Sequence, residues 1–372
     1  MNTLFVIIIS LLCVIVNSSP TSNPGFTKIN LRKVYTSEID SELLSLLKRD
    51  PQGTAKLVNQ NDRRYVGSVF VGGQNFTIIF DTGSANLWVP SVYCTDAACT
   101  GANMYDPAKS TTYKMLPAPN NFSVNFGDGS QIQGYKATDT VSLGGLSITQ
   151  TIGVVTVFGS RSYSGGGVMG LRFTPDASFN TPTVIQTMKA QNILNKALIS
   201  FRFSPNSPSY LTLGDVPNEY SNSISYNKVV DNSSWTIAMS DVQVDGSSLG
   251  LKSNALVDTG ATIIYGDSDH VSTILGKISG ASLSNNIWWI PCDTKTKISL
   301  VFNGVPYEID PSNFIRSKNA TTGLCRSGIQ PQPAATAAAG LTWTLGDVFL
   351  TNVLAAFDFD NLQIGLAKPV AT

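Results

Sequence analysis

The chain has 372 residues, enough for one large bilobal domain or two ordinary domains with a sizeable buried core. Its 25 basic and 25 acidic residues give a formal net charge of zero, and only 13% of the residues are charged, so nothing predicts a nucleic-acid partner. His270 is the only histidine, which excludes metal sites built from several histidines.

Residues 1–18 are typical of a signal peptide. Residues 4–16 form an apolar run in which only Ser10 is polar, and small and polar residues follow from Asn17. A helix of this length spans about 20 Å, short of the roughly 30 Å hydrocarbon core of a bilayer, so a cleaved signal is favoured over a membrane anchor. We expect cleavage after Ser18 and entry into the secretory pathway. The mature chain then has no membrane partner, and its destination is extracellular, lumenal or a lysosome-like compartment.

Residues 19–60 differ from the rest of the chain and are predicted to be a propeptide with an uncertain boundary. They hold six basic and four acidic residues, and leucine and isoleucine side chains at residues 39–47 recur near helical spacing. An ordinary N-terminal extension fits the charge equally well. Alternative processing points are the dibasic pair Arg63 and Arg64 and a cut near residues 55–60.

From Tyr65 onward the sequence predicts a protein made mostly of β-strands. Short runs of β-branched and aromatic residues alternate there with Gly, Asn, Ser and Asp. Helical patterns are few, the best being residues 183–189 and 269–278, so a large parallel α/β sheet is disfavoured. The alanine-rich residues 334–339, between Pro333 and Gly340, are expected to form a loop.

One pattern occurs twice with nearly the same spacing. Asp-Thr-Gly follows an apolar run at Asp81 and again at Asp258. A glycine after an apolar residue lies 89 positions beyond the first aspartate, at Gly170, and 88 positions beyond the second, at Gly346. A repeat of this length predicts two lobes of similar plan.

The repeat suggests a chemistry for its aspartates. A tight turn after a strand orients each carboxylate, which accepts hydrogen bonds from the turn. If a pseudo-twofold axis relates the copies, Asp81 and Asp258 face each other in a cleft suited to an extended ligand. Two facing carboxylates share one proton, so one apparent pKa of the pair is lowered and the other raised. One aspartate can then activate water while the other protonates a carbonyl, with no metal and no cofactor.

These features together resemble the pepsin-like (family A1) aspartic proteases in their secreted zymogen form. The resemblance runs from about residue 60 to the end. It implies an all-β, bilobal fold with a few short helices, the first aspartate and a flap in an N-terminal lobe at residues 61–230, and the second aspartate in a C-terminal lobe at residues 231–372. The motifs are residues 80–90 (FDTGSANLWVP), 167–171 (GVMGL), 257–261 (VDTGA), 344–347 (TLGD) and 357–366 (FDFDNLQIGL).

The resemblance also implies an activity, aspartic endopeptidase cleavage of peptide or protein substrates between bulky apolar residues. Asp81 and Asp258 match the catalytic pair, and we expect the enzyme to be a monomer. The residues that would orient the pair are Thr82, Gly83, Ser84, Thr259 and Gly260. Those that would form the flap or contact the substrate are Phe126, Gly127, Asp128, Trp88 and Val168.

Two positions depart from the family pattern. Phe126 stands where the flap usually has a tyrosine, so a hydrogen bond worth about 0.5–1.5 kcal/mol is lost while the ring remains. Ala261 stands where many acid-active members have a hydroxyl, which disfavours the Asp258 anion and predicts a higher pH optimum. These departures leave an alternative open, a weak or inactive protein on the same scaffold that binds peptides or glycans. Both aspartates and their turns are intact, which favours the enzyme.

The cysteines indicate an oxidising compartment. Cys13 leaves with the signal, and an even number remains, for which three pairings exist. We expect Cys94 with Cys99 and Cys292 with Cys325, because each bond closes a local loop. Candidate N-glycosylation sequons begin at Asn75, Asn121, Asn232 and Asn319.

Overall fold

The computed structural model describes residues 53–59, 65–99, 103–126, 130–159, 166–176, 178–205, 208–338, 340 and 342–370. The predicted signal peptide, the amphipathic helix at residues 39–47 and the Arg63-Arg64 pair lie outside these residues. Within them, no helix is long and apolar enough to span a bilayer.

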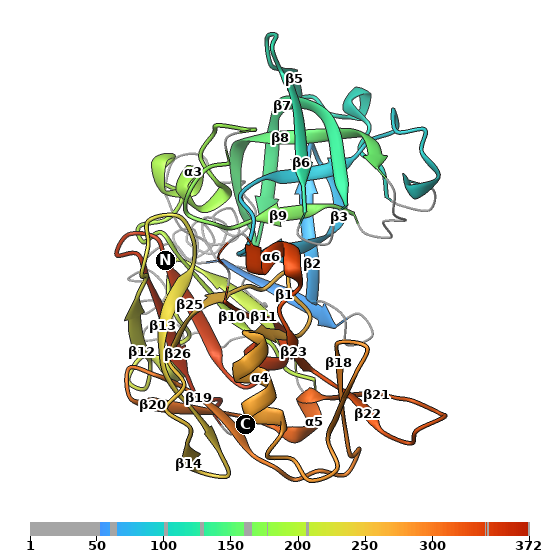
Figure 1. The fold of residues 1–372 in the computed structure, drawn as a ribbon. Coiled ribbons are helices and arrows are strands. Elements are labelled where there is room, and N and C mark those ends of the chain that lie inside the picture. The colour runs from blue at the N-terminus through green and yellow to red at the C-terminus, as the bar shows by residue number, and fades with distance from the viewer. Residues whose placement is uncertain are drawn as a thin grey trace, which may run out of the picture.

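Strands dominate the described residues and form sheets of 14, 8 and 4 strands. The prediction of a mostly β, bilobal fold is confirmed, and Figure 1 shows the blue-to-green strands gathered in one lobe and most of the orange strands in the other. The largest sheet contains β1 (Gly53–Asn59), β2 (Tyr65–Val71), β3 (Gln74–Asp81), β4 (Leu87–Pro90), β5 (Lys114–Met115), β6 (Asn121–Asn125), β7 (Gln131–Leu143), β8 (Leu146–Gly159), β9 (Val168–Gly170), β10 (Leu198–Arg202), β11 (Ser209–Leu213), β12 (Ser225–Lys228), β25 (Leu354–Asp358) and β26 (Gln363–Ala367).

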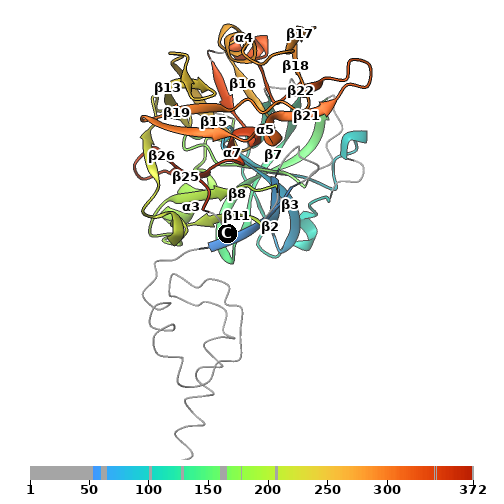
Figure 2. The same cartoon turned by 90° about the horizontal axis from the view of Figure 1, so that it is seen from below.

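The other two sheets belong to the second lobe, which Figure 2 shows on the opposite side from β2 and β3. The eight-stranded sheet contains β13 (Thr236–Val244), β14 (Ser247–Ser248), β15 (Ser253–Val257), β16 (Ile264–Gly266), β19 (Ile298–Phe302), β20 (Val305–Ile309), β23 (Ile329–Pro331) and β24 (Trp343–Leu345). The four-stranded sheet contains β17 (Ser282–Ser284), β18 (Ile287–Ile290), β21 (Ile315–Lys318) and β22 (Cys325–Ser327).

The α-helices of the described residues are short, and two of them match predicted segments. Thr183 precedes the first, where it forms a capping box with Gln186, and Asp267 caps the second by accepting hydrogen bonds from two backbone amides. The helices are α3 (Val184–Ala190), α4 (Ser268–Leu275), α5 (Pro311–Phe314), α6 (Ala334–Ala338) and α7 (Asp347–Leu350).

The loop prediction for residues 334–339 is wrong, because α6 occupies most of them. Alanine has the highest helix propensity of all residues, and the carbonyl of Pro333 accepts hydrogen bonds from the amides of Thr336 and Ala337. Gly340, at φ 83°, follows the helix in the left-handed conformation that favours glycine. The proline and glycine that bound the segment therefore mark the two ends of a helix.

The repeated spacing arises from a strand arrangement that occurs once in each lobe. In the first lobe β3 pairs in parallel with β9, β9 pairs antiparallel with β4, and β4 pairs in parallel with β8. In the second lobe β15, β24, β16 and β23 pair in the same sequence of directions. Asp81 lies opposite Gly170, and the amide of Asp258 donates to the carbonyl of Leu345, next to Gly346.

Both glycines of the repeat are needed for close backbone approach. A Cβ atom on Gly170 would lie 2.3 Å from the backbone of Ala85, and one on Gly346 would lie 2.3 Å from the carbonyl oxygen of Ala261. Each glycine thus allows the loop that follows an aspartate to pack directly on the parallel strand beside it.

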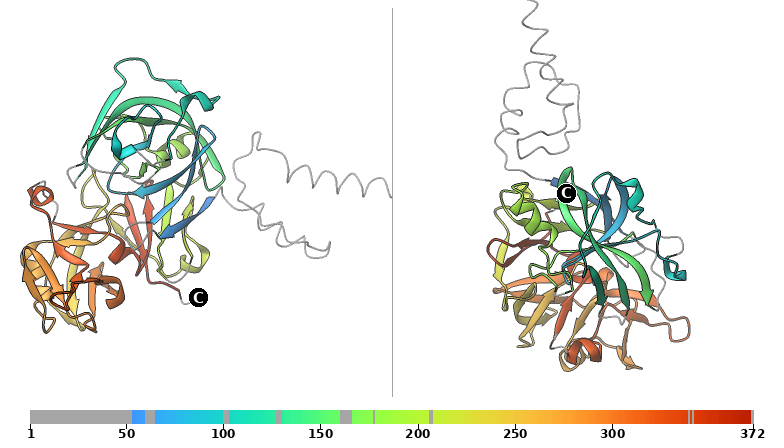
Figure 3. Two further views of the ribbon diagram at one scale, coloured as in Figure 1. Left: turned by 90° about the vertical axis from the view of Figure 1, so that its right-hand side faces the viewer. Right: turned by 90° about the horizontal axis from the view of Figure 1, so that it is seen from above.

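The large sheet joins the two lobes, as Figure 3 shows from the side. Strands β25 and β26 near the C-terminus pair with β10 and β12, and β10 continues through β11 to β1 and β2. The side chain of Trp235 strengthens the joint. It packs edge-on against Phe173, Phe357 and Phe359, and its Nε1 donates to the carbonyl of Leu171 at 2.9 Å.

Strand β1 falls within residues 19–60, the predicted propeptide. Both of its edges are paired, Lys56 lying opposite Tyr210 of β11 and Val58 opposite Val66 of β2. A cut after residue 60 would therefore remove an interior strand from the joining sheet, and its backbone hydrogen bonds with it.

The two disulfides are those predicted from the sequence. Cys94 bonds to Cys99 across five residues, and Cys292 bonds to Cys325 across 33 residues. The first closes a loop after β4, and the second ties the end of β18 to β22. Each disulfide stabilises segments of a single lobe, as predicted for cysteines paired with near neighbours in sequence.

Candidate active site

The two Asp-Thr-Gly turns face each other where the lobes meet. The Oδ1 atom of Asp81 accepts a hydrogen bond from the amide of Gly83 at 2.9 Å, and the Oδ1 atom of Asp258 accepts one from Gly260 at 2.8 Å. A Cβ atom on Gly260 would lie 2.5 Å from Oδ1 of Asp81, and one on Gly83 would lie 2.6 Å from Oδ2 of Asp258. Each carboxylate therefore contacts the turn of the opposite lobe, and only glycine fits there.

The threonines between aspartate and glycine lock the turns together. The amide of Thr82 donates to Oγ1 of Thr259, and the amide of Thr259 donates to Oγ1 of Thr82, both at 3.0 Å. The two hydroxyls donate in turn to backbone carbonyls of the opposite strand, Thr82 to Val257 at 2.8 Å and Thr259 to Phe80 at 2.7 Å. Both threonines are buried, where hydrogen bonds are stronger than in water, so these bonds hold the two turns in register.

The symmetry ends at the residue after each glycine. Oγ of Ser84 donates to Oδ2 of Asp81 at 2.5 Å, whereas the corresponding residue beside Asp258 is Ala261, which has no hydroxyl. Burial, and next the charge of Asp81, hold the pKa of Asp258 well above its usual range. The two carboxylates therefore differ in the hydrogen-bond donors beside them.

Asp347 is a third carboxylate near this pair that sequence reasoning named only as part of a motif. It begins α7, is buried, and its amide donates to the carbonyl of Ala261 at 2.9 Å. Burial, and next the charge of Asp258, raise the pKa of Asp347 well above its usual range, while Arg316 opposes the rise. The signal in the sequence that could have identified Asp347 is its place directly after Gly346, because that glycine contacts the second turn.

An apolar cluster lies beside Asp81. Side chains alternate along β3, so Ile79, which packs into this cluster, lies on the same face of the strand as Asp81, while Phe80 faces the main core. The ring of Trp88 lies 6.1 Å from that of Phe126 and 5.7 Å from that of Phe158. The cluster comprises Trp88, Phe122, Ile132, Val155, Val168 and Phe179, with Ile79, Val124, Phe126 and Phe158 packed against it.

The predicted flap is described only in part. Strands β6 and β7 form a hairpin, and the amide of Phe126 donates to the carbonyl of Ser130 at 2.8 Å just beyond them. Gly127 and Asp128 lie outside the described residues. The hairpin brings Phe126 to Trp88, and Val168 of β9 is paired with both Ile79 and Trp88.

The sequons differ in exposure. The side chains of Asn75, Asn121 and Asn232 are exposed, and that of Asn319 is half-buried, with its Oδ1 accepting from the amides of Thr321 and Thr322. Glycosylation at any of the four stays a prediction.

Comparison with known proteins identifies a family whose sequence model includes both Asp-Thr-Gly turns. The sequence model of the eukaryotic aspartyl protease family matches residues 64–369. Pepsin A of Bos taurus is 35% identical over 329 residues, which cover 85% of this chain and 86% of that protein. Cathepsin E of Mus musculus is 34% identical over 336 residues, covering 84% and 82%. Pepsin A of Sus scrofa is 33% identical over 333 residues, covering 86% and 84%.

The match spans both turns, both lobes and the joining strands β25 and β26. Because the family model covers most of the chain, and relatives at this level of identity match it over more than four fifths of its length, the chain belongs to the eukaryotic aspartyl protease family and is an aspartic-type endopeptidase, a hydrolase.

Proposed function

We propose that this protein cleaves peptide bonds with water activated between Asp81 and Asp258. The observation that carries the proposal is the pair of facing turns, in which each carboxylate contacts the other lobe's glycine and the threonines hold both turns in register. A protein that only binds peptides would gain nothing from two carboxylates held so that they share a proton.

The asymmetry of the pair assigns a role to each carboxylate. Ser84 and the amide of Gly83 stabilise negative charge on Asp81, so Asp81 is the general base. Asp258, whose pKa is raised, holds the proton and is the general acid. General acid–base catalysis of this kind contributes about 10²–10⁴-fold to a rate.

The steps balance within the pair. Asp81 takes a proton from water as the water oxygen attacks the carbonyl carbon, and Asp258 gives its proton to the carbonyl oxygen. The tetrahedral intermediate that results is a gem-diol. A proton then passes from the pair to the amide nitrogen, the C–N bond breaks, and a hydroxyl proton of the gem-diol returns to the pair as the new carboxyl group forms. The free enzyme regains one shared proton.

The apolar cluster supports a preference for bulky apolar residues beside the cleaved bond. It lies on the Asp81 face of β3, and the aromatic side chains of Trp88, Phe126 and Phe158 meet there. A substrate side chain of similar character would gain about 25 cal/mol for each Å² of apolar surface that it buries.

We further propose that the mature enzyme begins near Gly53 and works in the secretory pathway or beyond it. The double pairing of β1 favours a processing cut before Gly53 over one after residue 60. The apolar residues 4–16 and the disulfides favour secretion. N-terminal sequencing of the secreted, processed protein tests both, since a mature chain that begins after residue 60 would contradict the first.

The activity is tested with a denatured protein substrate between about pH 3 and pH 7, after incubation of the secreted protein in acid. We expect cleavage that pepstatin, an inhibitor directed at the catalytic pair of this family, abolishes. Folded and processed protein without turnover at any of these pH values would contradict the proposal and favour a binding role on the same scaffold.

A further inference from the structure

The loop closed by Cys94 and Cys99 reaches a strand that is remote in sequence. Strand β4 runs parallel to β8, and the pairing continues to Ser91, whose amide donates to the carbonyl of Val155 at 3.1 Å. The chain then turns away into the disulfide loop, where the amide of Cys94 donates to the carbonyl of Ser91 at 2.9 Å. Past this point β8 has no backbone partner from β4, although β8 continues to Gly159.

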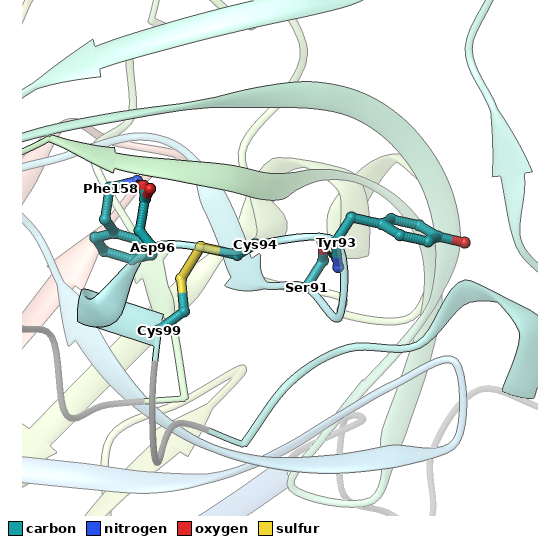
Figure 4. Close-up of a disulfide and its surroundings, with 6 residues drawn as sticks. All are labelled: Ser91, Tyr93, Cys94, Asp96, Cys99 and Phe158. Carbon is teal, nitrogen blue, oxygen red and sulfur yellow. Dashed lines mark hydrogen bonds between the residues drawn. A yellow bond between two sulfur atoms is a disulfide. The ribbon is translucent and has the colours of Figure 1, made fainter.

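Beyond Ser91, the side chain of Asp96 replaces β4 as a hydrogen-bond partner of β8. Oδ2 of Asp96, inside the loop, accepts a hydrogen bond from the backbone amide of Phe158 at 2.6 Å, across 62 positions of sequence. Figure 4 shows the Asp96 carboxylate directed at Phe158, with the disulfide beside it and Tyr93 directed away. Both sulfur-bearing residues are buried, so the loop that holds Asp96 is anchored at both ends.

Phe158 packs against the apolar cluster beside Asp81. Its ring lies 5.7 Å from that of Trp88, and its backbone lies opposite Ile132 of β7, the strand that forms one side of the flap hairpin. The neighbouring pair in this register is Gln131 of β7 with Gly159 of β8. Gln131 is also paired, on its other side, with Asn125 of β6. The position of Phe158 therefore bears both on Trp88 and on the turn end of the flap hairpin.

We propose that Asp96 is a positioning residue for substrate selection: by holding the backbone of Phe158, it keeps the Phe158 ring against Trp88, in the apolar cluster that a bulky apolar substrate residue would contact. The inference rests on the proposed function. It assigns the disulfide Cys94–Cys99 a role in substrate selection as well as in stability, because the bond fixes the loop that carries the carboxylate.

The contact itself is tested without any need for activity. Hydrogen exchange at the Phe158 amide is compared in the wild type, Asp96→Asn and Asp96→Ala. Asparagine keeps an acceptor oxygen in the same place, so we expect protection close to that of the wild type, whereas alanine should raise the exchange rate about tenfold or more. Asp293→Ala, which removes an exposed carboxylate beside the other disulfide, is the matched control and should leave this amide unchanged.

The effect on selection is tested with two peptides that differ only in phenylalanine or alanine just before the cleaved bond. Their affinities are measured in an Asp81→Asn background, which keeps the peptides intact, and their kcat/KM values in the active enzyme. Asp96→Ala should lower the Phe-to-Ala ratio of both quantities about three- to tenfold, through KM more than kcat, and Asp96→Asn should restore it. The double variant Cys94→Ser with Cys99→Ser should lower the ratio in the same direction.

Further outcomes separate this proposal from the proposed function. With Phe158→Ala already present, Asp96→Ala should lower the ratio no further, because the effect passes through that ring. An unchanged exchange rate at Phe158 in Asp96→Ala, or a faster rate with an unchanged affinity ratio, would overturn the role of Asp96. Absence of turnover in the wild type would contradict the proposed function only, since the exchange and affinity measurements would still decide the role of Asp96.

Discussion

Thr82 and Thr259 exchange hydrogen bonds across the lobe interface, the amide of each donating to Oγ1 of the other at 3.0 Å. Two lobes that are separate in sequence are thus bonded at the point where their carboxylates meet. The arrangement makes stability and catalysis depend on the same two side chains.

Thr259→Ala should therefore weaken both the stability of the fold and catalysis. The change leaves the amide of Thr82 buried without its acceptor and the carbonyl of Phe80 without its donor, at a cost of about 1–3 kcal/mol for each unsatisfied group. We expect the free energy of unfolding to fall by at least about 2 kcal/mol, measured by urea denaturation. Thr259→Ser keeps the hydroxyl and should lose less than half as much, so equal losses in the two variants would contradict the role of the hydrogen bonds.

Two raised carboxyl pKa values predict how stability changes with pH. Asp258 and Asp347 bind their protons more tightly in the folded than in the unfolded chain. The stability that this contributes is fully present below the unfolded pKa, near about 4, and is lost as the pH rises through the folded values. The urea midpoint should thus fall between acid and neutral pH, and Asp347→Asn should make that fall smaller.

Asp269→Asn is the control for this experiment, because Asp269 is an exposed carboxylate in the first turn of α4. It should leave the fall in midpoint between acid and neutral pH as it is in the wild type. If Asp347→Asn also leaves the fall unchanged, Asp347 does not hold its proton in the folded state.

Ala261→Thr supplies the second turn with the hydroxyl that Ser84 supplies to the first. A donor beside Asp258 stabilises its anion and so lowers its pKa. Because Asp258 holds the proton that catalysis uses, the alkaline limb of the pH profile of kcat/KM should move to lower pH by about one unit, equivalent to about 1.4 kcal/mol. Ser84→Ala removes the donor beside Asp81 and should move the acidic limb to higher pH. An alkaline limb that stays in place in Ala261→Thr would show that the missing hydroxyl does not set the pH optimum.

Phe126→Tyr restores the hydroxyl that the flap lacks, on a ring already 6.1 Å from that of Trp88. One added hydrogen bond worth about 0.5–1.5 kcal/mol should raise kcat/KM about two- to twelvefold. Phe126→Leu keeps an apolar side chain but loses the aromatic contact, and it should lower kcat/KM. Peptide cleavage assays on the three forms decide the point, since an unchanged or lower value for Phe126→Tyr would mean that the hydroxyl has no role here.

The sequence alone predicted the part of the site that short local motifs encode. Asp81 and Asp258 stand in short motifs, and of the glycines that follow them at nearly the same interval, Gly170 ends the parallel strand β9 and Gly346 directly follows the parallel strand β24. The local disulfides and the helix caps at Thr183 and Asp267 were likewise readable from nearby residues.

The sequence alone did not predict contacts between segments that are distant along the chain. Asp347 acts electrostatically on Asp258 from a helix 89 positions later, and only its place directly after Gly346 marked it. Asp96 accepts a hydrogen bond from the amide of Phe158 across 62 positions, with no pattern in the sequence to mark it. The pairing of β1 with β11 is likewise not marked by the composition of residues 19–60. Tertiary packing decided these features, whereas α6, where a loop was expected, agrees with the high helix propensity of alanine.

The measurement that tests the central claim most directly is peptide turnover by the wild type, Asp81→Asn and Asp258→Asn, each expressed per molecule of processed, folded protein. The account predicts turnover in the wild type, reduced by at least about 10²-fold in either variant, because each carboxylate is required for one proton transfer. Undiminished turnover in either variant, or its absence in the folded wild type, would contradict catalysis by the pair.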